Sequence, residues 1–154
     1  MIMKVFLDTN VFAEYIFERN QFTSVQRIFQ AIENKEIEAI TSSASIYTLT
    51  YLSEQMLKHK GIHRPELTEL VRKIVHSMLQ LVPIGNMEQS EMLLGVKDYS
   101  FSDIEDSFQY QCALKNQCNY LISLNNKDFP NTSNEIITVT PNEFVGRIIP
   151  KLKQ

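Results

Sequence analysis

Acidic and amide side chains stand at three separate places in this sequence, each beside a run of apolar residues. Asp8 follows directly on the first apolar run, and Asn125 and Asp128 follow a later one. Asp103 and Asp106 lie three residues apart in a segment with helical spacing. Because a bare charge at the rim of a core is costly unless something pairs with it, these side chains call for a partner.

A divalent cation is the partner that such a set predicts. Carboxylates that converge in one crevice repel one another, and Mg²⁺ or Mn²⁺ bound by oxygen ligands removes that repulsion. The three histidines and two cysteines do not have the spacing of a zinc site. The reaction that an acidic site with a divalent cation supports best is phosphodiester hydrolysis.

The elements that must position these side chains alternate between strands and helices. Apolar runs and turn residues predict five strands, over residues 3–8, 37–43, 81–84, 119–124 and 136–140. Helical spacing predicts seven helices, over residues 10–18, 22–35, 45–60, 65–80, 86–98, 101–117 and 141–149. Strands separated by helices of this length favour right-handed crossovers and a parallel sheet.

The predicted fold is therefore an α/β class, three-layer α/β/α arrangement with a central parallel sheet of four to five strands. We expect one domain over residues 1–150, with residues 151–154 as a short tail. In open parallel sheets, ligands bind beyond the carboxyl ends of the strands. The three groups of polar side chains are expected to meet at that edge.

Composition limits the possible partners. The chain has 154 residues and a net charge of -3, which gives no overall attraction to nucleic acid or to an anionic membrane. The best local candidates for phosphate contact are Lys58, Lys60 and Arg64. No apolar run approaches the length of a membrane span and no signal-peptide pattern is evident, so we expect a cytoplasmic protein with no membrane partner and reduced cysteines.

Several motifs together resemble the PIN-domain nucleases, most closely the bacterial branch found in toxin–antitoxin systems. They are VFLDTNVF at the start, FSDIEDSFQYQCAL and LISLNNKDFP in the second half, and ITVTPNEFV near the end. The resemblance implies an endoribonuclease that cleaves RNA with Mg²⁺ or Mn²⁺ held by four acidic residues. It also implies a homodimer and, for the toxin of such a pair, an antitoxin protein as partner.

Carried over from that family, the motifs assign roles to individual residues. Asp8 matches the first acid and Asp106 the third. Asn125 stands where many relatives have the fourth acid, with Asp128 shortly after it. Asn10 matches the residue that supports the first acid.

The sequence departs from the family pattern at the second acid. Relatives usually carry a glutamate early in the helix after the second strand, and Thr48 stands there in this chain. Asp103 and Glu105 could compensate for the missing charge.

Each of these residues also has a purely structural interpretation. Asp8, Asn10 and Asp103 are of residue types that favour helix N-caps, and Asp128 is of a type common in turns. Glu105 is a surface acid or a partner of Lys127.

Two other functions are alternatives. One is a phosphoaspartate enzyme of the haloacid dehalogenase type, which lacks support because its second aspartate is replaced by Asn10. The other is a catalytically weak PIN-like module that binds RNA or a protein.

Aromatic residues on two predicted helices favour self-association. They are Phe12, Tyr15, Phe17, Tyr47 and Tyr51, which we expect to be exposed. The resemblance to the PIN-domain nucleases implies that such a homodimer places two sites in one groove.

Overall fold

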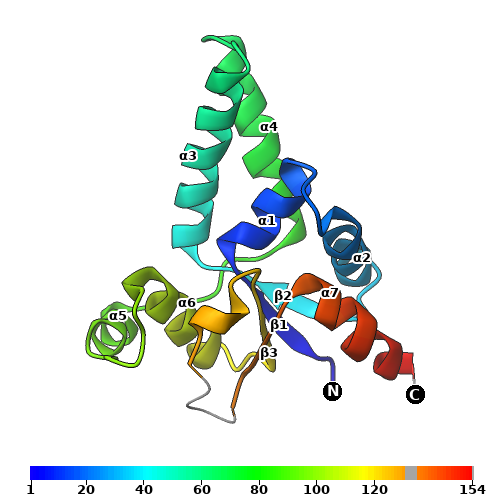
Figure 1. Cartoon of the computed structure of the whole chain (residues 1–154), viewed down its shortest axis with the longest axis vertical. Helices are drawn as coiled ribbons and strands as arrows, with labels where there is room; N and C mark the ends of the chain where they lie inside the picture. The colour runs from blue at the N-terminus through cyan, green and yellow to red at the C-terminus, as the bar shows by residue number, and fades with distance from the viewer. Residues whose placement is uncertain (131–134, 154) are drawn as a thin grey trace.

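A parallel sheet forms the centre of the molecule, shown in Figure 1. The structure, a computed structural model, describes residues 1–130 and 135–153. The strands are β1 (Lys4–Leu7), β2 (Glu38–Ile40), β3 (Tyr120–Ile122) and β4 (Ile137–Val139). They follow the order β2-β1-β3-β4, and every neighbouring pair is parallel.

Helices surround this sheet. They are α1 (Thr9–Ile16), α2 (Phe22–Glu33), α3 (Ser43–His59), α4 (Glu66–Leu81), α5 (Gln89–Val96), α6 (Ile104–Lys115) and α7 (Pro141–Glu143). Three short elements are η1 (Asn126–Asp128), η2 (Phe144–Ile148) and η3 (Ile149–Lys153). The three-layer α/β/α fold predicted from the sequence is confirmed.

Alternate residues of the strands face opposite layers. Val5 and Leu7 are fully buried in a cluster that includes residues of α1, α2 and η2. Phe6 and its register partner Leu121 point the other way, into a second cluster with residues of α6. Because both faces are covered, the strands are mostly apolar, which is why they could be located as continuous runs.

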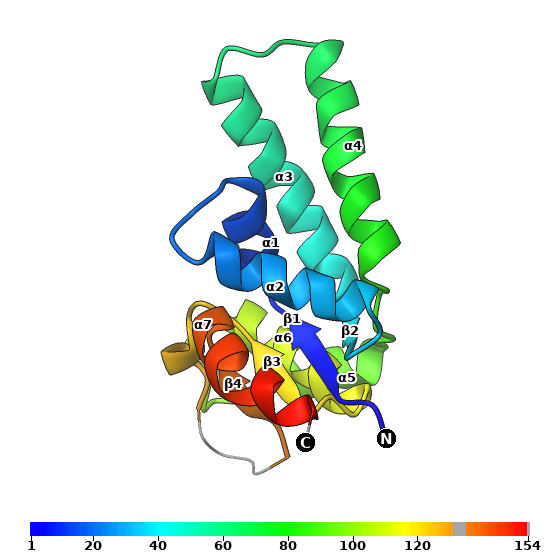
Figure 2. The same ribbon diagram turned by 90° about the vertical axis from the view of Figure 1, so that its right-hand side faces the viewer.

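Helices α3 and α4 form an antiparallel hairpin that projects from the body of the molecule (Figures 1 and 2). The two chain ends lie close together at the opposite end of the molecule in both views. Within the described residues, none of the helices combines the length and the apolar character that a membrane span requires.

Two predicted elements are wrong in detail. Residues 81–84 do not form a strand, because α4 continues through Leu81 and Pro83 has no N–H to donate to a ladder. A single bridge between Thr41 and Ile84 is what exists there. The predicted last helix is divided into α7, η2 and η3. Of these, η2 is a π-helix, and the Ile149 N–H donates a hydrogen bond to the Phe144 carbonyl at its end.

The expectation of exposed aromatic residues near the N-terminus is also wrong in part. Phe12 is fully buried in the core, and Tyr15 stacks on Phe22 with 4.9 Å between ring centroids. On α3 the expectation is confirmed, because the exposed fractions of Tyr47 and Tyr51 are 76% and 61%.

The strand order places a topological switch point between β1 and β3. The chain leaves β1 to form β2 on one side and later returns to form β3 on the other side. In open parallel sheets such a reversal leaves a crevice at the carboxyl ends of the two strands, where ligands bind. The residues after β1 and β3 therefore define the candidate site.

Candidate active site

Asp8 is fixed at the carboxyl end of β1 by three hydrogen bonds. Its side chain is 6% exposed, and it is also the N-cap of α1. Oδ1 accepts from the Thr9 backbone N–H at 2.8 Å and from Gln109 Nε2 at 3.1 Å. Oδ2 accepts from Ser123 Oγ at 2.8 Å. The donors come from α1, α6 and the end of β3, so the carboxylate has one orientation.

Asn10 connects the first turn of α1 to the segment after β3. Its Nδ2 donates to Ser123 Oγ at 3.1 Å, and its Oδ1 accepts from the Leu124 N–H at 3.1 Å. Ser123 in turn donates to Asp8. Asn10 therefore supports Asp8 through Ser123 and connects the segments that follow the carboxyl ends of β1 and β3.

Asp103 caps α6 and leaves Asp106 in its first turn. Asp103 Oδ1 accepts from the backbone N–H groups of Glu105 at 2.8 Å and of Asp106 at 3.3 Å. Such a cap supplies acceptors for two N–H groups that a helix start leaves unpaired. The structural interpretation of Asp103 is thus confirmed, and its carboxylate is exposed.

The half-buried Asp106 carboxyl group is where the acidic side chains meet. Its pKa is raised to about 7, first by burial and then by the negative charges of Asp8, Asp103, Asp128 and Glu105. These four acids come from the ends of β1 and β3 and from the start of α6. The fold therefore brings the predicted acids close enough for their charges to affect the pKa of Asp106.

Asn125 precedes η1 and Asp128 is its last residue, shortly after β3. The Asn125 backbone N–H donates to Ser123 Oγ at 3.2 Å, and both side chains are exposed. This segment is joined to the start of α6 by Phe129, whose ring packs edge-on against Phe101 at 5.9 Å. In the part of the chain that the structure describes, Glu105 forms no ion pair with Lys127, so Glu105 is an exposed acid beside Asp106.

Helix α3 contacts the neighbours of Asp8 through Ser45. Ser45 Oγ accepts from Thr9 Oγ1 at 3.0 Å and from Gln109 Nε2 at 2.6 Å. Thr48 lies one turn further along α3 and is half-buried. Where the family pattern has an acid, this chain therefore has the neutral hydroxyl group of Thr48.

The basic residues predicted to contact RNA lie at the tip of the α3–α4 hairpin (Figure 2). Lys58 and Arg64 both pair with Glu54, at 3.0 and 2.8 Å. At 1.5 Å per residue, Lys58 is about 20 Å along α3 from Ser45. The structure does not bring these cations together with the acids.

Four polar residues of the site were missed by sequence reasoning: Ser42, Ser45, Gln109 and Ser123. All four are at most 3% exposed, and they link α3, α6 and β3 to Asp8. Gln109 does carry a signal, since it lies three residues after Asp106 and so faces the same side of α6. A glutamine on the buried side of a helix requires partners.

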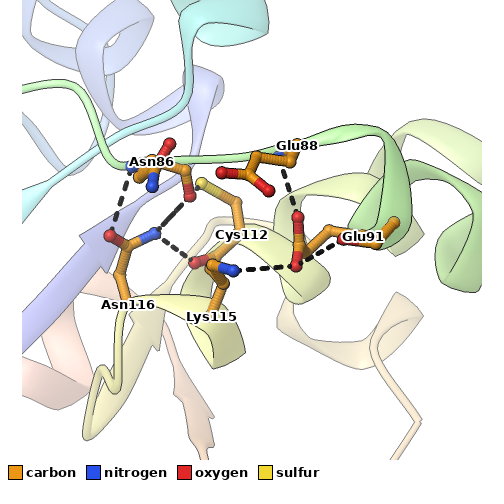
Figure 3. A network of polar contacts seen from close by, with 7 residues as sticks. Asn86, Glu88, Glu91, Cys112, Lys115 and Asn116 are labelled. Carbon is orange, nitrogen blue, oxygen red and sulfur yellow. Dashed lines mark hydrogen bonds and ion pairs between the residues drawn. The ribbon is translucent and has the colours of Figure 1, made fainter.

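Helix α6 is held in place by a second polar network, shown in Figure 3. Lys115 pairs with Glu91 of α5 at 3.1 Å. Asn116 donates from Nδ2 to the carbonyl oxygens of Asn86 and Cys112, each at 2.8 Å. These contacts connect the end of α6 to α5 and to the segment before it, and so fix the helix that carries Asp106 and Gln109.

The residues present fit a hard divalent cation held through few protein ligands. The available donors are carboxylate and amide oxygens, which Mg²⁺ and Mn²⁺ prefer. Among residues 1–130 and 135–153, no three His, Cys, Asp or Glu side chains stand close enough together to form a ready-made metal cage. Mg²⁺ usually binds one or two carboxylates plus water and substrate phosphate, and Asp8 with Asp106 supplies that number.

Comparison with known proteins defines the class. The sequence model of the PIN domain family matches residues 4–127, and the chain belongs to this family. It is also similar to Ribonuclease VapC1 of Aquifex aeolicus (strain VF5), with 33% identity over 147 residues that cover 94% of each chain. The resemblance stated from the motifs is confirmed, and the haloacid dehalogenase alternative is wrong.

Proposed function

We propose that this chain is a Mg²⁺- or Mn²⁺-dependent endoribonuclease that acts as the toxin of a toxin–antitoxin pair. The observation that carries the proposal is the convergence of Asp8 and Asp106 at the switch point between β1 and β3 in a PIN-domain chain. The similarity to a protein named as a ribonuclease over 94% of both chains supports RNA as the substrate.

In this proposal Asp8 and Asp106 are the catalytic residues that hold the cation. Asn125 and Asp128, with the exposed Asp103, complete the oxygen-rich rim and hold water molecules and substrate there. When bound, such a cation supplies activation of water and stabilisation of the charge that develops on the phosphoryl group. Asp8 brings a preset orientation to this task, because three hydrogen bonds fix it beforehand.

The raised pKa of Asp106 supports the same assignment. Without a bound cation, the Asp106 carboxyl group is partly protonated near neutral pH, because burial and its acidic neighbours disfavour its charged form. With a cation at the site, the charged form of Asp106 would be favoured, and Asp106 would serve as a ligand. Asn10 and Glu105 are supporting residues, the first through Ser123 and the second through its charge.

We further propose two protein partners, an antitoxin and a second copy of the chain. Exposed apolar side chains occur on α5, in the segment after it and at the first residue of α6. Helix α5 lies at the edge of the molecule in Figure 1. The exposed apolar side chains are Met92, Leu93, Leu94, Val96, Tyr99 and Ile104, with exposed fractions of 40%, 50%, 56%, 55%, 94% and 57%. We call these residues the α5 patch. Contiguous exposed apolar residues are typical of protein interaction sites.

Cleavage of single-stranded RNA in Mn²⁺ tests the proposed function. Asp106→Asn should lower the cleavage rate by roughly a hundredfold or more and leave RNA affinity nearly unchanged, because a ligand of the cation acts mainly on transition-state charge. Asn142→Ala, at an exposed residue of α7, is the matched control and should cleave normally. If the wild-type protein binds RNA in Mn²⁺ without cutting it, the binding-module alternative replaces the nuclease.

A further inference from the structure

Gln109 is one corner of a closed ring of hydrogen bonds beside Asp8. Its Nε2 donates to Ser45 Oγ at 2.6 Å, and its Oε1 accepts from Ser42 Oγ. Ser42 and Ser45 are in contact at 3.2 Å between their Oγ atoms. Since the single Ser42 hydroxyl proton goes to Gln109, the Ser45 hydroxyl must donate to Ser42. Every donor in the ring is therefore used, and the ring carries no charge.

The ring fixes which group Gln109 presents to Asp8. An ionised carboxylate can only accept, so the amide must direct an N–H to Asp8 Oδ1, and its oxygen is turned toward Ser42. Gln109 is 1% exposed, and Ser42 and Ser45 are 3% and 0% exposed. Water does not compete for these bonds, and the amide cannot rotate without breaking the ring.

The two oxygens of Asp8 are consequently unequal. Oδ1 accepts from the Thr9 N–H and from Gln109, which uses both of its lone pairs. Oδ2 accepts from Ser123 and, within the described residues, from no second donor. Of the two atoms, Oδ2 therefore retains a free acceptor position, whereas Oδ1 does not.

We infer that Gln109 is a positioning residue that commits Asp8 Oδ1 to the protein and leaves Oδ2 as the atom for a single cation. This inference rests on the proposed function, since it concerns the same site. One free acceptor position on Asp8 corresponds to one bound cation.

Mn²⁺ titration of the metal-free protein by calorimetry tests this inference without any measurement of activity. Gln109→Met keeps the shape of the side chain but removes its hydrogen bonds, and we expect Mn²⁺ affinity to fall roughly 10- to 100-fold, as for other partners that orient a ligand. Val71→Ala, in the buried face of α4, is a matched control for lost stability. It should melt earlier and bind Mn²⁺ with wild-type affinity.

A second variant tests the one-cation prediction in the opposite direction. Gln109→Glu places a carboxylate where the amide donated, and the repulsion from Asp8 should lower the thermal midpoint of the metal-free protein. Added Mn²⁺ should restore the midpoint, and the calorimetric stoichiometry should rise from one ion to two. Wild-type affinity in folded Gln109→Met, or two ions on the wild-type protein, would overturn the inference but leave the nuclease proposal in place. If the wild-type protein binds no Mn²⁺, both are wrong.

Discussion

One carboxylate, that of Asp8, serves the fold and the proposed chemistry through different oxygen atoms. Oδ1 caps α1 by accepting the N–H of Thr9, the first residue of the helix. Oδ2 is joined to Ser123 at the neighbouring strand end. The structural and functional interpretations of this residue are thus compatible, because a cap at the end of a central strand also stands at the switch point of the sheet.

Thr48 permits a gain-of-function prediction at the level of a single residue. Thr48→Glu adds a carboxylate at the position where the family pattern has one, and we expect Mn²⁺ affinity to rise by roughly tenfold, or about 1.4 kcal/mol. RNA cleavage should become faster as well. Tyr47→Glu, at the exposed neighbouring residue, adds the same charge on another side of α3 and should change neither quantity. Equal Mn²⁺ affinity in the two variants would contradict the prediction.

The acids of the site could be predicted from the sequence, but the ring that holds Asp8 could not. Asp8 and Asn125 follow apolar runs, so the end of a parallel strand is implied by the pattern itself. Gln109 and Ser42 are separated by 67 residues along the chain, and Gln109 and Asp8 by 101. Such pairs are set by the packing of α6 and α3 against the sheet, and no local spacing shows them.

At the level of elements, the pairing of α5 with α6 gives a prediction about pH. The pKa of Glu91 is lowered from 4.5 to about 2, first by the hydrogen bond from the Glu88 N–H and also by Lys115 and Ser90. A lowered pKa adds stability that is present above the unfolded value and is lost as the pH falls toward the folded value. The window is therefore between about pH 5 and pH 2.

Glu91→Gln should remove the loss of folding stability that the wild-type protein shows as the pH falls through this window. Urea unfolding of the wild-type protein should show a midpoint that falls through the window, whereas the variant starts lower at neutral pH and falls less. Glu33→Gln, at an exposed residue of α2, is the control and should behave as the wild-type protein does. Parallel pH profiles for wild type and Glu91→Gln would show that this carboxylate does not couple α5 to α6.

The hairpin tip gives a second prediction at this level. Replacing Lys58, Lys60 and Arg64 together by Gln should weaken RNA binding, and the slope of log affinity against log salt should become shallower by roughly 0.7 for each phosphate that the variant no longer neutralises. Because Lys58 and Arg64 already pair with Glu54, we expect the change in slope to be smaller than three free cations would give. Filter binding over a salt series measures this slope. Replacement of Arg72 and Lys73 on α4 is the control, and an equal change there would assign the effect to overall charge.

The elements themselves were predictable where one physical pattern dominated. The strands buried on both faces and the helices with one apolar face were placed within a few residues. The failure at residues 81–84 has a local cause, since an apolar run this short is compatible with a helix end as well as with a strand. Phe12 was assigned to the surface because helical spacing alone does not show that α1 packs under α2 and α3.

At the scale of the whole molecule, charge and apolar surface have to be considered together. The net charge of -3 and the acids at the rim of the sheet oppose the approach of RNA, and the cations of the hairpin tip lie far from the rim. The α5 patch adjoins the start of α6, where Asp103 and Asp106 lie. A second copy that docks on this patch would therefore stand next to the acids.

The last prediction concerns this dimer. Wild-type protein at tens of micromolar, an ordinary concentration for micromolar association, should show a dimeric mass in light scattering. Leu93→Asp with Leu94→Asp places two charges in the α5 patch and should give a monomer, because burying unpaired charges opposes association. The fold should remain intact, since the exposed fractions of the two leucines are 50% and 56%. Leu79→Asp, at an exposed leucine of α4 outside the patch, should remain dimeric. A monomeric wild-type protein would show that the proposed dimer does not form. Loss of the dimer in Leu79→Asp alone would place the association surface outside the α5 patch.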